Sequence, residues 1–207
     1  MKSWLVSLAL VALASSHAAA DNLYADPNDP GRVTAIGRGV KEIDLGGLFI
    51  LTHNKSGDGE GTTRVSSLGG ASFQYFLKDN LSVGGTALFN YDRISSTTSA
   101  TAFGGMAFAS LHVRLGLGAF LRPTFGGGLL VGKQQTELTP GTSTSANQLA
   151  GIVRLALPFA YFPSRRIVLQ AGPELNLTLG TTSPDGADSE TFVTISGGFG
   201  LSAGYVF

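Results

Sequence analysis

The chain contains no cysteine and carries little charge. With no cysteine among its 207 residues, disulfides, thiolate metal sites and a lipid-modified cysteine anchor are all excluded. Charged residues make up 14% of the chain, against about 25% in an ordinary soluble domain. The 14 basic and 14 acidic residues balance, so the net charge gives no reason to expect nucleic acid as a partner.

Long hydrophobic runs are also missing, with one short exception at the N-terminus. A basic start precedes an apolar run over Trp4–Ala14, which is too short to span a bilayer as a helix. Ala18 and Ala20 then occupy the small-residue positions of a signal cleavage site. No later stretch has about 18 consecutive apolar residues. The sequence therefore predicts a signal peptide over residues 1–20 and no transmembrane helix after it.

Glycine is abundant where charge is scarce. The 29 glycines are about twice the usual share of roughly 7%. Beyond a lead-in over 21–39, which has no clear period and is expected on the periplasmic side under a barrel mouth, residues 40–207 alternate between apolar and small polar positions. This alternation predicts β-strands. Eight strands are expected, at 41–53, 63–77, 81–93, 101–115, 121–134, 147–161, 166–180 and 191–207.

The expected connections alternate between short turns and longer loops. The short ones are 78–80, 116–120 and 162–165, and the longer ones are 54–62, 94–100, 135–146 and 181–190. Short turns at one end and long loops at the other are typical of outer-membrane barrels. Both termini then lie at the short-turn end, which requires an even number of strands.

The alternation has the same parity in every expected strand. In 81–93, for example, Leu81, Val83 and Phe89 are odd-numbered, whereas Ser82 and Thr86 are even-numbered. Alternate residues of a strand point to opposite faces. Because small side chains suit the crowded interior of an eight-stranded barrel, we expect the odd face to meet lipid and the even face to line the lumen. A soluble, lipocalin-like barrel that buries the odd face is the alternative.

The C-terminal segment carries a family resemblance. Thr191–Phe207 ends in Tyr205-Val206-Phe207 and resembles the closing strand of bacterial outer-membrane barrels, and Leu121–Gly132 resembles a strand of the OmpA, OmpX and OmpW-like class. The resemblance implies an all-β, eight-stranded antiparallel up-and-down transmembrane β-barrel in the outer membrane of a Gram-negative cell. It also implies that Tyr205 and Phe207 form a signal for the barrel-assembly machinery, and that the partners are outer-membrane lipid and lipopolysaccharide around a monomer.

Charged residues with inward parity are the main candidates for a functional site. Isolated charges in a narrow interior are costly, so these residues are expected to pair. A turn that pairs Tyr161 with Ile167 sets Arg154 directly opposite Glu174. The resulting hypothesis is a lumen plugged by ion pairs, and the alternative is a gated pore. The candidates are Glu42, Asp44, Asp92, Arg114, Arg122, Arg154 and Glu174.

No motif predicts catalysis, a cofactor or a metal site. Gly127–Lys133 nearly matches a phosphate-binding loop, but Gln134 replaces the required Ser or Thr and no helix follows, so a strand is expected. His112 is expected to form hydrogen bonds in the lumen. Acidic residues of two outer loops have the oxygen ligands that calcium prefers, although solvated charges are the simpler interpretation. These residues are Asp58, Glu60, Asp185, Asp188 and Glu190.

Three classes of function are compatible with these patterns. The first is a structural or surface-interaction barrel, and the second is a narrow, porin-like passage for small or hydrophobic solutes. The third is a lipid A-modifying hydrolase, because lipid A deacylases have a similar size and use a His and a Ser close together. Their spacing is two residues on a strand, whereas His53 and Ser56 are three apart with the serine in a loop. The departure favours a protein that is not an enzyme.

The cleavage site gives the first testable prediction. Because Ala18 and Ala20 precede the expected cut, the membrane-associated protein should begin at Asp21. Intact-mass measurement of the protein purified from the membrane fraction checks this. A purified barrel that retains Met1 would contradict it.

Overall fold

The computed structural model describes residues 23–26, 29–54, 62–93, 97–116, 118–139, 142–184 and 188–207. The expected signal peptide lies outside this part of the chain, as do the side chains of several strand residues, including His53 and Asp92. Within the described ranges, no helix is long and apolar enough to cross a membrane.

The eight expected strands are all present in the structure. Three of them are interrupted, at His112, at Arg122–Pro123 and at Leu157–Pro158, so each forms two consecutive elements. The strands are β3 (Lys41–Asn54), β4 (Thr62–Lys78), β5 (Leu81–Arg93), β6 (Thr98–Leu111), β7 (Val113–Gly116), β8 (Ala119–Leu121), β9 (Thr124–Thr139), β10 (Thr142–Ala156), β11 (Phe159–Ser164), β12 (Ile167–Pro184) and β13 (Glu190–Val206).

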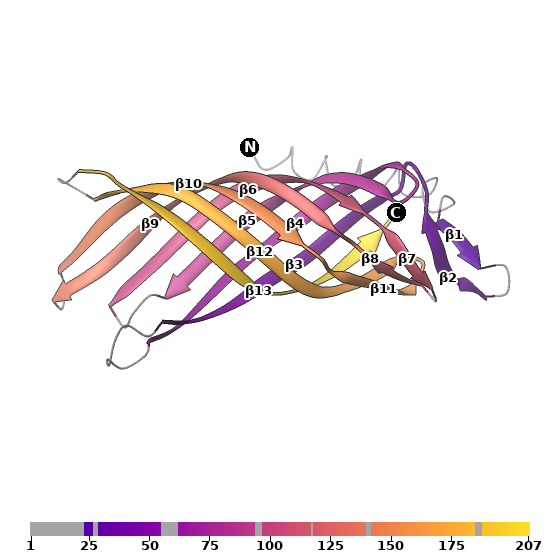
Figure 1. Cartoon of the computed structure of the whole chain (residues 1–207), viewed down its shortest axis with the longest axis horizontal. Coiled ribbons are helices and arrows are strands. Elements are labelled where there is room, and N and C mark those ends of the chain that lie inside the picture. The colour runs from indigo at the N-terminus through magenta and orange to yellow at the C-terminus, as the bar shows by residue number, and fades with distance from the viewer. Residues whose placement is uncertain are drawn as a thin grey trace, which may run out of the picture.

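The main sheet closes on itself. Antiparallel pairings run from β3 through β4, β5, β6, β9, β10 and β12 to β13, and β13 pairs with β3 again. This ring of eight leaves no open edge among its members, which confirms the expected up-and-down barrel (Figure 1). The short elements β7, β8 and β11 continue the wall at the short-turn end.

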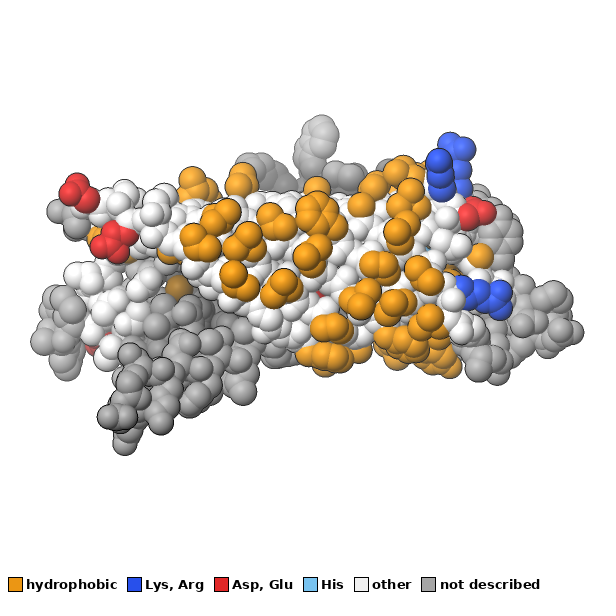
Figure 2. Space-filling view, viewed as in Figure 1, with side chains coloured by type: hydrophobic (Ala, Val, Ile, Leu, Met, Phe, Trp, Pro, Cys, Tyr) orange, Lys and Arg blue, Asp and Glu red, His pale blue; other side chains and the backbone are white. Residues whose placement is uncertain are grey.

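The two faces of the barrel have the expected parity. Every large apolar side chain that is exposed on the described part of the chain has an odd number, from Ile43 to Tyr205. Leu45 and Ile195 are 67% and 71% exposed. Such a band is stable only in contact with lipid, because water contact costs about 25 cal/mol per Å² of apolar surface. The barrel therefore spans a membrane, and the soluble alternative is excluded (Figure 2).

The loop between the fifth and sixth expected strands is much shorter than expected. Residues 135–146 were expected to form a long loop, but β9 continues to Thr139 and β10 begins at Thr142. Their ladder extends from Thr124↔Ala156 to Thr139↔Thr142. Backbone pairing can continue beyond the lipid even where Ser, Thr and Gln replace the apolar face, and this explains why hydrophobic alternation underestimated the strands.

A hairpin lies at the short-turn end, where the sequence showed no clear period. It consists of β1 (Leu23–Asp26) and β2 (Asp29–Ile36). Val33 and Ile36 are buried in a cluster with barrel side chains that include Phe76, Phe120 and Phe162. Asn80, which has a φ of 60°, donates its backbone N–H to Ile36 O and accepts the Ile36 N–H at Oδ1. The hairpin thereby caps the short-turn mouth (Figure 1).

The lipid-facing band gives a depth-dependent prediction. Leu175 is 48% exposed near the middle of the apolar series of β12, so Leu175→Arg should cost about 2–4 kcal/mol of folding free energy. Thr181→Arg, on the same face at the outer end of β12, should cost about 0–1 kcal/mol. Urea unfolding in vesicles measures both. Equal costs would show that this face does not meet the bilayer.

Candidate functional site in the barrel lumen

A buried ion pair crosses the lumen near the short-turn end. Arg122, at the break between β8 and β9, donates from its two terminal nitrogens to the carboxylate oxygens of Glu42 on β3, at 2.5 and 2.8 Å. The exposed fractions of the two side chains are only 2% and 0%. The Arg122 guanidinium also lies 5.6 Å from the centre of the Phe162 ring. A two-point bond of this kind fixes the orientation of both side chains.

A second carboxylate joins this pair. Asp44 is buried, and its Oδ1 accepts a hydrogen bond of 2.8 Å from Gln170 Nε2, which also approaches Glu42 Oε1 at 3.3 Å. Asp44 stands opposite Gly204 in the ladder of β3 and β13. A Cβ atom at Gly204 would collide with the Asp44 carboxylate. The glycine therefore provides the space in which this carboxylate sits.

Arg154 and Glu174 meet, but not in the expected register. The ladder of β10 and β12 pairs Arg154 with Asn176, and Glu174 with Ala156. The expected register was wrong by two residues because β11 extends to Ser164 and the turn is only Arg165–Arg166. A register shift of two residues leaves both side chains on the lumen face of the sheet.

The contact between these two charges is therefore diagonal. Arg154 Nε lies 3.4 Å from Glu174 Oε2, without the geometry of a hydrogen bond. Arg154 Nε–H instead donates a hydrogen bond to Asn176 Oδ1, at 3.1 Å. The side chains of Arg154 and Glu174 are 13% and 16% exposed, so this pair is less enclosed than Arg122 and Glu42. The carboxylate occupies space left by Gly200, where a Cβ atom would collide with it.

A short hydrogen-bonded chain includes the lumen histidine. Ser82 Oγ donates to Gln74 Oε1 at 2.7 Å and lies 3.1 Å from His112 Nε2. Because the serine hydroxyl has one proton, His112 Nε2 is the donor to Ser82. His112 also lies against Phe76, with 4.7 Å between ring centres. The expected hydrogen bonding of His112 in the lumen is confirmed.

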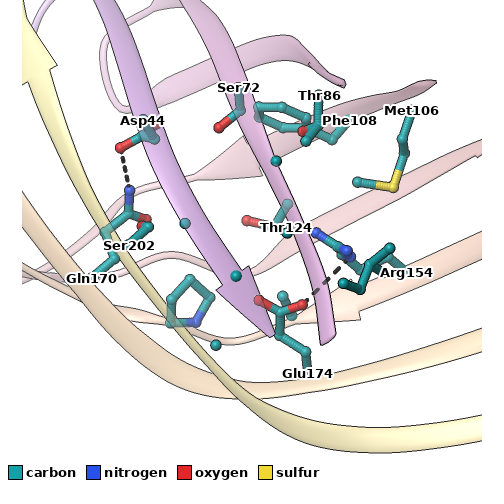
Figure 3. A pocket seen from close by; sticks show the side chains of 18 of the residues that line it. Asp44, Ser72, Thr86, Met106, Phe108, Thr124, Arg154, Gln170, Glu174 and Ser202 are labelled. Atoms are coloured by element: carbon teal, nitrogen blue, oxygen red, sulfur yellow. Dashed lines mark hydrogen bonds and ion pairs between the residues drawn. The ribbon is translucent and has the colours of Figure 1, made fainter. Parts of the chain in front are cut away.

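Apolar side chains fill the lumen on the long-loop side. Leu88, Met106, Leu130 and Ile152 are buried there in one cluster with Leu68, Ala102 and Ala150. Between this apolar layer and the Arg122–Glu42 pair lies a cavity of about 120 Å³ with both polar and apolar lining residues. Asp44, Arg154, Gln170, Glu174 and Ser202 are among its lining residues (Figure 3). Space remains in the middle of the lumen, and packed side chains lie on both sides of it.

The remaining candidate residues do not belong to this site. Arg114 is exposed rather than enclosed, because β7 continues beyond the break at His112 to the rim of the barrel. The side chains of Asp92 and His53, and all of Ser56, lie outside the described residues. Gly127–Lys133 forms part of β9, as expected. Asp188 and Glu190 are exposed, and the described residues contain no cluster of three or more potential metal ligands.

Sequence reasoning missed the uncharged partners of the lumen charges. Gln170, Asn176 and Gln74 share the inward parity of the charged residues, and this parity was the available signal. Their partners depend on the register and the shear of the barrel, which alternation alone does not specify. The lead-in was expected under the barrel mouth, but its hairpin of β1 and β2 was not predicted, because its sequence showed no clear period.

The fold defines a class, namely small membrane-spanning β-barrels. Solved structures of similar fold include the N-terminal β-barrel domain of Pseudomonas aeruginosa OprF, with 16% identity, a TM-score of 0.44 and coverage of 83% of this chain and 99% of that chain. Neisserial surface protein A has 14% identity, a TM-score of 0.47 and coverage of 83% and 97%. Ail of Yersinia pestis has 15% identity, a TM-score of 0.44 and coverage of 82% and 99%. No protein-family model and no curated protein matches the chain.

The Arg122–Glu42 pair gives a prediction about stability. Glu42→Gln leaves the Arg122 guanidinium buried without its carboxylate, so it should cost on the order of 3–5 kcal/mol. The double change Glu42→Leu with Arg122→Met should cost less, because no charge is then buried. Glu174→Gln is the matched control and should cost less than Glu42→Gln, since its pair is partly exposed. A double-mutant cycle from urea unfolding in detergent measures the coupling, and a value near zero would contradict the pairing.

Proposed function

We propose that this chain is an outer-membrane barrel with a closed lumen, acting as a structural or surface-interaction protein rather than as a pore or an enzyme. The observation that carries the proposal is the sequence of obstructions along the lumen. The hairpin cap, the Arg122–Glu42 pair and the apolar layer around Ile152 follow one another from the short-turn end outward. A narrow porin-like passage would require at least three such barriers to move.

The polar ends of the long hairpins support a role at the cell surface. β9 and β10 extend past the apolar band, and exposed residues such as Glu137 and Thr144 lie in their outer parts. Acidic side chains lie beyond the band at this end (Figure 2). These hairpins offer a polar surface to lipopolysaccharide or to a protein outside the cell.

The C-terminal strand supports insertion by the barrel-assembly machinery. Tyr205 is 43% exposed, and it faces the lipid side of the wall. Phe207 exchanges two backbone hydrogen bonds with Lys41, of 2.8 and 2.9 Å, at the seam where the last strand meets the first. The residues proposed as the assembly signal thus lie at the place where the ring is completed.

The closed lumen can be tested with a single cysteine, because the chain has none of its own. Ser202→Cys places a thiol in the wall of the cavity, and the folded barrel in vesicles should resist a charged thiol reagent. Thr144→Cys, on the exposed outer part of β10, is the control and should react fully. Planar-bilayer recordings of the wild type should show no stepwise increases in ionic current. Rapid labelling of Ser202→Cys together with steps would favour the porin-like alternative.

A further inference from the structure

The hydrogen-bond ladder of the barrel wall is interrupted along one line. Pro123, Pro158 and Pro173 stand on neighbouring strands and have no N–H to donate. Single backbone bonds bridge the line. Leu111 N–H donates to Pro123 O at 3.0 Å, Arg122 N–H to Pro158 O at 2.8 Å, and Leu157 N–H to Pro173 O at 3.0 Å. Each of these backbone bonds therefore uses a proline carbonyl as its acceptor.

A groove of about 590 Å³ follows this line on the outer surface of the barrel. Its floor is one row of ladder partners, Ser110, Thr124, Ala156 and Glu174. One ridge consists of Leu111, Pro123, Leu157 and Pro173, and the other of Ala109, Phe125, Leu155 and Leu175. The same four floor residues also line the lumen cavity, so one layer of chain separates the two spaces. The groove belongs to the lipid-facing band, because its ridges are odd-numbered apolar residues.

The groove has the length of a lipid chain. It begins at Leu81 on β5 and crosses β6, β9 and β10 to reach Leu175 on β12. Four spacings of about 4.8 Å between strands give roughly 19 Å. One leaflet accounts for half of a hydrocarbon core of about 30 Å. An acyl chain that enters at the rim and runs obliquely inward therefore fits the groove from end to end.

Basic side chains stand where the groove meets the rim. Lys78 is the ladder partner of Leu81, and Arg114 follows Leu111 by three residues. Both side chains are exposed. The neighbouring acidic residue, Asp79, accepts the Arg38 N–H at its Oδ1, at 3.2 Å. The apolar groove thus begins beside two exposed cations at the short-turn end of the barrel.

We propose that this groove binds one anionic glycerophospholipid. Its phosphate contacts Lys78 and Arg114, and one acyl chain lies in the groove along the row of Pro123, Pro158 and Pro173, which we call the proline line. The proposal rests on the membrane location proposed above and adds a specific partner to it. The charge of the rim selects an anionic headgroup over a zwitterionic one, and the groove selects a chain over a soluble phosphate. The rim charges and the groove can be removed by separate substitutions.

The test is native mass spectrometry of the folded protein titrated with dioleoyl phosphatidylglycerol or dioleoyl phosphatidylcholine in detergent micelles. The wild type should retain one phosphatidylglycerol in preference to phosphatidylcholine. Lys78→Gln and Arg114→Gln should each weaken phosphatidylglycerol retention about fivefold, because a basic residue near an anionic lipid contributes about 1 kcal/mol. Ala109→Leu should weaken retention of both lipids, because it fills the groove.

Matched controls come from the same surfaces. Lys133→Gln removes an exposed charge from β9 at the opposite end of the barrel, and Ala107→Leu enlarges a lipid-facing alanine two residues from Ala109, outside the groove. Both should behave as the wild type. Soluble glycerol 3-phosphate should not compete. If Ala109→Leu does not fold, the comparison of Lys78→Gln and Arg114→Gln with Lys133→Gln decides the result.

The outcomes separate this inference from the proposed function. Equal retention of the two lipids, competition by glycerol 3-phosphate, or variants that match their controls would overturn the lipid site while the barrel still inserts into vesicles. A protein that fails to insert, with no heat-modifiable folded band on gels, would instead contradict the membrane barrel itself.

Discussion

The closure of the β-ring is the constraint from which the rest of the structure follows. Lipid offers no hydrogen bonds, so every backbone N–H and C=O within the bilayer must find its partner inside the protein. The pairing of β13 with β3 meets this requirement, with ladder partners from Phe199↔Phe49 to Val206↔Glu42. Apart from the shifted pairs Lys78↔Leu81 and Thr139↔Thr142 at two hairpin ends, ladder partners in the ring have numbers of the same parity. One face of the closed sheet is therefore apolar and the other is enclosed. The enclosed face must then hold whatever polar groups the sequence places on it.

Enclosure explains the arrangement of the lumen. Glu42 and Arg122 are distant in sequence but meet where β3 and the break before β9 face each other, and their two hydrogen bonds offset the loss of water. Arg154 and Glu174 retain partial exposure to the cavity and make a looser contact. The apolar layer around Ile152 needs no partners and fills the remaining width. Ion pairs and apolar packing thus occupy the lumen at different depths.

Alternation predicted the strands and their faces because it depends on one local property, the period of two residues. It could not predict the register, which depends on turn geometry: the turn at Arg165–Arg166 moved Glu174 from opposite Arg154 to opposite Ala156. Parity alone also placed Arg114 in the lumen, although β7 has already reached the rim there. The hairpin of β1 and β2 has no clear alternation in its sequence, so its strands were not predicted. Contacts across the barrel require shear and tilt, which no local pattern contains.

The proline line shows how the same constraint can be relaxed locally. Each proline removes one donor from the ladder, yet each of their carbonyl oxygens still accepts a bond from Leu111, Arg122 or Leu157 on the next strand. The three proline carbonyls are therefore satisfied within the wall, as the bilayer requires. The outer groove follows this row of prolines. The floor residues Ser110, Thr124 and Ala156 turn their side chains toward the lumen, so only their backbone faces the groove between its two apolar ridges.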